Sequence, residues 1–215
     1  KKAQEIILAA KEGAVRADGT RLPISVKTRI GYNKNELETW LPALLEAGPA
    51  VITLHARTRK EMSKVPARWE HVARAVEIRD EFSEKIWAME KQGSASENNS
   101  GDNTSSENDS REKTLIIGNG DVLSIQDGYE KCKATGADGA MLGRAIFGNP
   151  WLFKNLVGDV SGAASDTIGA PGPAYIPTIQ EKLNAMVEHT KIFETHLGDI
   201  KNFAIMKKHY KAYVN

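Results

Sequence analysis

Short apolar runs alternate with amphipathic stretches over the first two thirds of the chain. Runs rich in β-branched or small apolar residues predict four strands, which cover residues 23–29, 50–54, 114–117 and 139–142. Helical spacing of apolar residues between these runs predicts three helices, at residues 36–47, 69–86 and 124–135. Strands and helices that alternate in this way indicate parallel βα units.

The ends and interruptions of these helices are predicted from single residues. Pro42 lies in the middle of the first helix and is expected to kink or restart it. The second helix is expected to break near Arg79. Ser124 and Gly136 are suited to begin and end the third helix.

Two polar segments interrupt this pattern, and the second of them separates two domains. Residues 93–113 contain no large apolar side chain and are rich in Ser, Asn, Glu and Gly, so we expect disorder. A tolerated surface insertion is favoured there over a regulatory or phosphorylatable loop. Residues 161–177 are rich in Gly and Pro and predict a linker. This linker would join an α/β domain over residues 1–160 to a helical region over residues 178–215.

The C-terminal region predicts two helices. Thr178 begins the first, which ends at Gly198 and carries an apolar stripe of Ile179, Leu183, Met186, Val187 and Phe193. The second covers residues 200–214, and its lysines lie mostly off its apolar side. Such a basic face suits contacts with the phosphates of a folded RNA, and an ordinary solvated helix face is the alternative.

The composition excludes several classes of protein. Among 215 residues, 29 Lys and Arg stand against 28 Asp and Glu, so a uniformly basic nucleic-acid coat is excluded but a local basic face is not. The single cysteine excludes an intramolecular disulfide framework and a cysteine-cluster zinc site. No apolar run approaches the roughly 20 residues of a membrane span. We therefore expect no metal and no membrane, a monomer, and a reducing location, the cytoplasm with the mitochondrion as the alternative.

Each predicted strand runs directly into a polar cluster, at residues 27–29, 55–59, 119–121 and 143–144. A (β/α)8 TIM barrel builds its active site from these strand ends. A doubly wound sheet would instead place a Gly-rich turn after its first strand, and no Gly-x-Gly-x-x-Gly follows any strand here. The sequence therefore favours an α/β TIM barrel, of which four βα units make half.

Two basic side chains should meet at the mouth of this barrel. Alternation places Lys27 on one face of its strand with Ser25 and Arg29, and His55 on one face of the next strand with Arg57. Donor groups that converge on one point suit an electron-rich ligand such as a reduced flavin. The alternative is that Lys27 is a surface residue and that His55 is a hydrogen-bonded core residue.

The last two strands indicate a phosphate site. Gly118, Gly120, Gly139 and Gly143 let backbone N–H groups approach a ligand, and Arg144 adds a guanidinium. Phosphate binding after the last two strands is common in TIM barrels. Tight turns alone would also explain the glycines.

Five motifs follow one another in the order VKTRIGYN, TLHARTRKEM, ARWEHV, IIGNGDV and TGADGAMLGRAIFGNPWLF, over most of residues 22–153. In this combination they resemble the bacterial-type branch of the flavin-dependent tRNA-dihydrouridine synthases. MKKHYKAY, at residues 206–213, is similar to the helical domain of that family. The resemblance implies the C-terminal half of a TIM barrel followed by part of a helical domain. Residues 1–13 would be the helix before the fifth barrel strand, so a fragment without the N-terminal half is expected.

The resemblance also implies an activity and its site residues. NADPH would reduce FMN, hydride would pass from flavin N5 to C6 of a tRNA uridine, and a general acid would protonate C5 to give 5,6-dihydrouridine. Lys27 and His55 would contact the isoalloxazine. The ribityl phosphate would be held by Asn119, Gly120, Asp121, Gly143 and Arg144. The uridine or the RNA backbone would lie near Arg29, Arg57, Arg59, Lys207, Lys208 and Lys211.

The chain departs from that family at the general acid. The family uses a cysteine in an Asn-x-Gly-Cys-Pro motif, which does not occur here, and Cys132 lies inside a predicted helix. We therefore expect the chain alone to bind FMN poorly and to turn over nothing. Another FMN- or phosphate-binding barrel oxidoreductase and a non-catalytic RNA-binding remnant are the alternatives.

Overall fold

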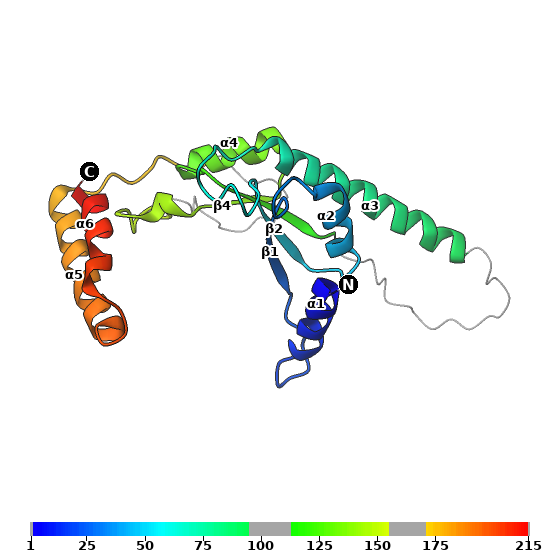
Figure 1. Cartoon of the computed structure of the whole chain (residues 1–215), viewed down its shortest axis with the longest axis horizontal. Helices are drawn as coiled ribbons and strands as arrows, with labels where there is room; N and C mark the ends of the chain where they lie inside the picture. Colours follow the sequence, from blue (N-terminus) through cyan, green and yellow to red (C-terminus); the bar gives the residue numbers. More distant parts are fainter. Residues whose placement is uncertain (1, 95–112, 155–170, 215) are drawn as a thin grey trace. The chain divides into compact units, whose positions relative to one another are not determined.

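A computed structural model describes residues 2–94, 113–154 and 171–214 (Figure 1). The chain divides into two compact units, Lys1–Gly120 with Lys131–Met141, and Asp121–Glu130 with Leu142–Asn215. The first unit contains the parallel sheet and three helices, α1 (Lys2–Gly13), α2 (Leu37–Leu45) and α3 (Glu70–Ser94). The second contains α5 (Ile179–Leu197) and α6 (Met206–Val214), and α4 (Ile125–Thr135) has residues in both units.

One parallel sheet forms the centre of the first unit. It consists of β1 (Ser25–Arg29), β2 (Val51–His55), β3 (Leu115–Asn119) and β4 (Gly139–Met141), which pair in chain order. All three pairings are parallel, which confirms the predicted βα units, because parallel neighbours need crossover connections. Four successive parallel strands in chain order are the arrangement of a partial TIM barrel.

The register brings the carboxyl ends of the strands into line. Arg29 is paired with His55, His55 with Asn119, and Asn119 with Met141. The polar clusters that follow β1, β2 and β3 therefore start from the same edge of the sheet.

The core of the first unit lies between the sheet and its helices. Ile52, Leu54 and Ile116 are completely buried, and they form one cluster with Leu41 and Leu44 of α2. Each such side chain stabilises the fold by about 1.5–3 kcal/mol relative to an exposed one. This packing fixes the strands from which the polar clusters extend.

Helix α3 is continuous, so the break predicted near Arg79 is wrong. Arg79 is buried, with 2% of its surface exposed. Its Nη1 donates to Asp138 Oδ2 at 2.5 Å and to the Thr114 carbonyl at 3.3 Å, and its Nε donates to Asp80 Oδ1 at 2.7 Å. Because these partners neutralise and solvate the guanidinium, a charged residue can occupy the buried face of α3 without interrupting it.

Two further predictions about helices need correction. Helix α2 runs through Pro42 without a restart, and the Pro42 carbonyl accepts from the N–H of Glu46 at 3.0 Å. The last helix is shorter than predicted, because residues 203–205 form a 3-10 turn. Asn202 begins that turn, since its side-chain oxygen accepts from the N–H of Ala204 at 2.8 Å, and α6 starts only at Met206.

The predicted helix caps are confirmed. Ser124 Oγ accepts from the N–H of Asp127 at 3.0 Å at the start of α4, and Gly136 follows its end with a φ of +72°. Thr178 and Glu181 form a reciprocal capping box at the start of α5.

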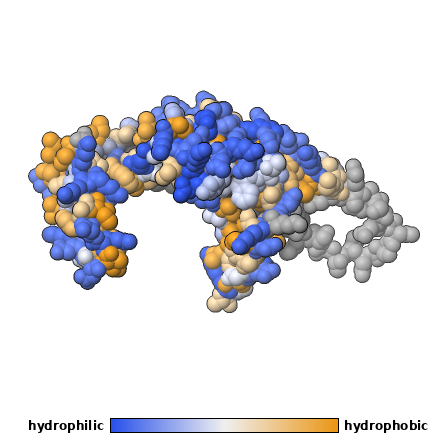
Figure 2. Space-filling model, in the orientation of Figure 1, coloured by the Kyte–Doolittle hydropathy of each residue, from blue (hydrophilic) through white to orange (hydrophobic). Residues whose placement is uncertain are grey.

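The apolar stripe predicted for α5 is only partly buried. Phe193 is 7% exposed, whereas Ile179 is 77% and Val187 is 50% exposed. Figure 2 shows apolar residues at the surface of the part of the chain that contains α5 and α6. The predicted insertion at residues 93–113 and the linker at residues 161–177 lie largely outside the described residues.

The buried position of Arg79 predicts a large effect on stability. Arg79→Met would leave the carboxylate of Asp138 without its guanidinium, and we expect the free energy of unfolding to fall by about 3 kcal/mol. Urea denaturation followed by circular dichroism would measure the loss. Arg74→Met is the matched control on α3, because Arg74 binds Glu38, Glu77 and Glu81 at the surface, where water screens the charges. Equal losses in the two variants would contradict the assignment.

Candidate functional site

Lys27 and Asn119 meet at the carboxyl edge of the sheet. Lys27 Nζ donates to Asn119 Oδ1 at 3.0 Å, across the intervening strand β2. The other side-chain atom of Asn119, Nδ2, donates to the Met141 carbonyl at 2.8 Å. The Asn119 amide therefore has one defined orientation, with its oxygen toward the ammonium group.

The ammonium group of Lys27 is set up to bind an anion. Its bond to Asn119 goes to a neutral amide oxygen, so the positive charge is not neutralised there. Partial burial, with a smaller contribution from the charge of Arg29, lowers the pKa of Lys27. Three N–H donors are available on an ammonium group and this bond uses one, so donors remain for a ligand.

The side chain of His55 contacts a buried arginine. Arg57, which is 3% exposed, places its Nη1 3.2 Å from His55 Nε2 and donates through Nε to the Val65 carbonyl at 2.6 Å. A guanidinium only donates, so His55 Nε2 accepts and the ring proton lies on Nδ1. Arg57, predicted near the substrate, thus contacts His55 and the loop that follows β2.

The loop between β2 and α3, residues 56–69, is organised around Glu61. Glu61 Oε2 accepts from the Thr58 N–H at 2.7 Å, from Thr58 Oγ1 at 3.0 Å and from Arg68 Nη2 at 2.9 Å. These bonds, the one from the Thr58 N–H above all, lower the pKa of Glu61. Sequence reasoning missed Glu61, although Thr-x-x-Glu at residues 58–61 is a capping-box pattern that could have indicated it.

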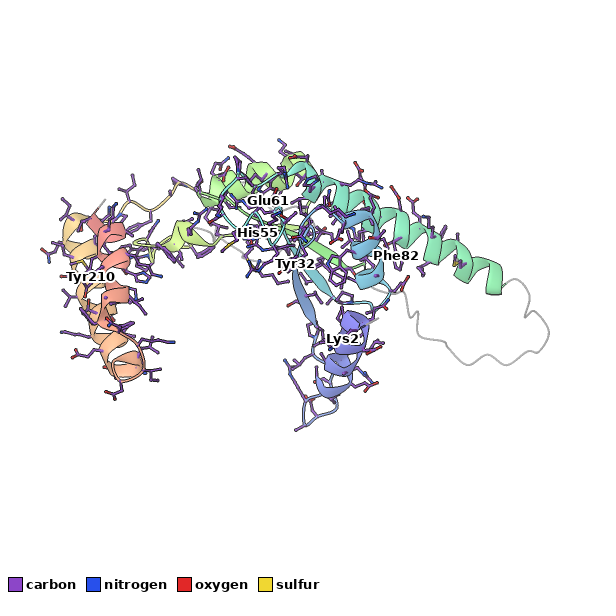
Figure 3. All side chains as sticks on the ribbon, in the orientation of Figure 1. Lys2, Tyr32, His55, Glu61, Phe82 and Tyr210 are labelled. Carbon is purple, nitrogen blue, oxygen red and sulfur yellow. The ribbon has the colours of Figure 1, made fainter. Side chains whose placement is uncertain are left out.

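Residues that follow β1 fix the same loop from the other side. Arg29 Nη1 donates to the Thr58 carbonyl at 2.9 Å and to the Met62 carbonyl at 3.3 Å. The backbone N–H of Arg59 donates to the Gly31 carbonyl at 2.9 Å, and that of Lys60 to the Tyr32 carbonyl at 2.9 Å. Figure 3 labels Tyr32, His55 and Glu61, which come from these neighbouring segments. The side chain of Arg59 is left exposed.

Two of the predicted phosphate residues contact each other in the second unit. Arg144 Nη2 lies 2.9 Å from Asp121 Oδ1, and 67% of the arginine side chain is exposed. Asp121 has a φ of +50°, a conformation that few non-glycine residues adopt. A Cβ at Gly143 would meet no atom within 4 Å, so packing does not explain the glycine there.

The basic residues of α6 lie on an exposed surface of the second unit. Lys207, Lys208 and Lys211 are all exposed, and Lys208 Nζ lies 5.9 Å from the centre of the Phe147 ring. Gly148 contacts the backbone of Ala212 so closely that a Cβ would clash, so the turn after Arg144 is packed directly on α6.

The described residues contain neither a cluster of metal ligands nor a helix that could span a membrane. In residues 2–94, 113–154 and 171–214, no group of three His, Cys, Asp or Glu side chains is placed to hold a metal ion. Within the same part of the chain, none of the helices has the length and apolar character that crossing a bilayer requires.

The sequence matches a family model and several curated proteins. The model described as dihydrouridine synthase matches residues 3–88 and 108–215, and it leaves out residues 89–107, within which most of the predicted insertion lies. The chain is 31% identical over 214 residues to a probable tRNA-dihydrouridine synthase of Staphylococcus aureus (strain MRSA252), which covers 99% of the chain and 49% of that protein. It is 35% identical over 153 residues to probable tRNA-dihydrouridine synthase 2 of Bacillus subtilis (strain 168), which covers 71% of the chain and 36% of that protein. The chain thus spans about half the length of the Staphylococcus relative.

The role of Glu61 can be tested by hydrogen exchange. Glu61→Ala removes the acceptor of three bonds, so we expect the amides of residues 56–69 to exchange faster, by on the order of tenfold. Hydrogen exchange followed by mass spectrometry would measure these exchange rates in the whole protein. Lys60→Ala, an exposed neighbour, should leave the rates unchanged; unchanged rates in Glu61→Ala as well would show that the loop does not depend on the carboxylate.

Proposed function

Because the chain belongs to the dihydrouridine synthase family, we propose that the protein reduces uridine in tRNA to 5,6-dihydrouridine. The single observation that carries this proposal is the cationic edge of the sheet, where Lys27 reaches Asn119 across β2. His55 lies on that strand, and Arg57 donates to its Nε2, which leaves the ring proton on Nδ1. Family membership alone would be compatible with a degenerate site, whereas the contact between Lys27 and Asn119 supports a site that still binds an electron-rich ligand.

FMN fits the residues at this edge. The Lys27 ammonium is a donor suited to the electron-rich pyrimidine part of a reduced flavin, and His55 lies on the same side of the sheet. The motif match extends the proposal to phosphate contacts by Asn119, Gly120, Asp121, Gly143 and Arg144. When bound, FMN would supply the hydride for the uridine, with NADPH as the source of its electrons.

The chain's own residues would bind and orient. Asn119 fixes the position of the Lys27 ammonium, and Arg57 fixes the tautomer and ring orientation of His55. Groups held in place in this way need no reorganisation when negative charge develops near them. The proposed role of the pair is therefore electrostatic, and neither residue has to transfer a proton.

Cys132 is not placed to donate the proton to C5. It lies on α4 and is partly buried against the core of the first unit. Burial, with a smaller contribution from the charge of Asp138, raises the pKa of the thiol. We therefore assign Cys132 a packing role, and the Asn-x-Gly-Cys-Pro motif of the family does not occur in this sequence.

Contacts with tRNA are proposed for Arg29 and Arg59 and for three lysines of α6, but not for Arg57, which is only 3% exposed. Arg29 ends β1 and Arg59 lies in the loop after β2, while Arg29 and the buried Arg57 bind backbone carbonyls and so shape this surface. Lys207, Lys208 and Lys211 are exposed on α6 and are suited to contact phosphates. A non-catalytic RNA-binding role, the alternative, would keep these contacts without turnover.

The proposal predicts that Lys27 is needed for flavin binding. Lys27→Met keeps the aliphatic stem but removes the charge, so we expect the dissociation constant for FMN to rise at least about tenfold. Flavin fluorescence titration of the protein that carries this sequence measures it, and mass spectrometry of tRNA nucleosides measures dihydrouridine. Lys60→Met, exposed on the neighbouring loop, is the control and should bind FMN as the wild type does. A wild-type protein that binds tRNA but never FMN would refute the flavin enzyme and support the RNA-binding alternative.

A packing role for Cys132 predicts a silent substitution. Cys132→Ser should leave the rate of dihydrouridine formation within about twofold, because the thiol lies on a helix against the core and takes no part in proton transfer. Single-turnover assays with reduced protein and unmodified tRNA would measure the rate. A loss of several orders of magnitude with an unchanged melting temperature would make Cys132 the proton donor after all.

A further inference from the structure

Trp69 joins the start of α3 to the end of β3. Its indole Nε1 donates to the carbonyl of Gly120 at 2.8 Å, 51 residues away along the chain. Its six-membered ring lies against Gly118, where an added Cβ would clash with the ring. Trp69 belongs to the ARWEHV motif, for which the proposed function gives no role.

Gly120 is enclosed on its remaining sides. Its φ is +121°, which side-chain-bearing residues rarely adopt. A Cβ there would lie 2.7 Å from Ala67 Cβ and 3.1 Å from His55 Cδ2. Positions 118 and 120 therefore have room only for glycine, and the ring of Trp69 packs against the first of them.

The bonds of Trp69 and Ala56 fix the backbone on both sides of Asn119. The carbonyl of Asn119 accepts from the N–H of Ala56 at 3.0 Å, and the next carbonyl, that of Gly120, accepts from Trp69. With both oxygens held, the direction of the Asn119 side chain is set before any ligand arrives. That side chain in turn holds the Lys27 ammonium at 3.0 Å.

We propose that Trp69 is a positioning residue for the FMN site, which sets Asn119, and through it Lys27, in the geometry that binds the flavin. This inference rests on the proposed function, because it takes FMN as the ligand. Trp69 itself need not touch the flavin: its effect passes through the Gly120 carbonyl.

The test compares two tryptophans that make equivalent bonds in the first unit. Trp69→Phe keeps a ring beside Gly118 but loses the bond to Gly120. Trp40→Phe loses a similar bond, from Trp40 Nε1 to Thr28 Oγ1 at 2.9 Å, and Thr28 lies on the opposite face of β1 from Lys27. Both tryptophans are partly buried. If Trp69 only stabilises the fold, the two variants should therefore bind FMN equally well.

We expect the dissociation constant for FMN to rise about tenfold in Trp69→Phe and less than about twofold in Trp40→Phe. Melting temperatures of the flavin-free variants should fall by similar amounts. The absorption maximum of bound flavin should shift in Trp69→Phe alone, because the charge beside it has moved. Fluorescence titration, absorption spectroscopy and thermal unfolding of the protein that carries this sequence provide these readouts.

A second variant covers the case in which Trp69→Phe does not fold. Gly118→Ala pushes the indole ring away without removing it, and it should also weaken FMN binding. Trp69→Phe lacks the outer ring atoms that the new Cβ at position 118 would clash with. In that background Gly118→Ala should therefore reduce the affinity for FMN less than it does in the wild type. The effects of the two substitutions on FMN affinity should not be additive.

The outcomes separate the two claims. If the wild type binds no FMN, the proposed function fails and the role of Trp69 fails with it. If the wild type binds FMN and the two tryptophan variants bind it equally well, only the positioning role is overturned. Additive effects of Gly118→Ala and Trp69→Phe would overturn it as well.

Discussion

The candidate site depends on the parallel backbone ladder that places Arg29, His55 and Asn119 side by side. Parallel strands expose all their carboxyl ends at one edge, and successive polar clusters along the sequence therefore become neighbours in space. The ladder is held by the completely buried Ile52, Leu54 and Ile116 beneath it. An apolar core with a polar rim is thus a direct consequence of β2 and β3, which are apolar in their middle and polar where they end.

Elements that rest on local pattern could be predicted from the sequence, and elements that rest on distant partners could not. The strands follow from short apolar runs, and the caps at Ser124 and Thr178 follow from residues within one turn of them. The break expected at Arg79 was wrong because its charge is matched by Asp138, 59 residues along the chain. A charged residue with no opposite charge nearby in the sequence is predicted to lie at the surface. Its distant partner becomes known only from the fold.

The same distinction applies to the candidate site. Alternation along β1 and β2 was enough to place Lys27 and His55 on the same face of the sheet, and the structure joins Lys27 to Asn119. The burial of Arg57 could not be anticipated, because its acceptor Val65 lies in a loop with no regular pattern. The contact of Trp69 with Gly120 was equally hidden, since an aromatic residue before a helix gives no sign of which distant carbonyl it will meet.

The close packing of Gly148 on Ala212 links two sets of cations within the second unit. The segment that contains Arg144 ends at this glycine, and α6 carries Lys207, Lys208 and Lys211. Because a backbone-to-backbone contact leaves no room for sliding, the guanidinium segment and the lysine helix should move as one body. Arg144, proposed for the flavin phosphate, and the three lysines, proposed for tRNA, should therefore keep a constant spacing within this unit.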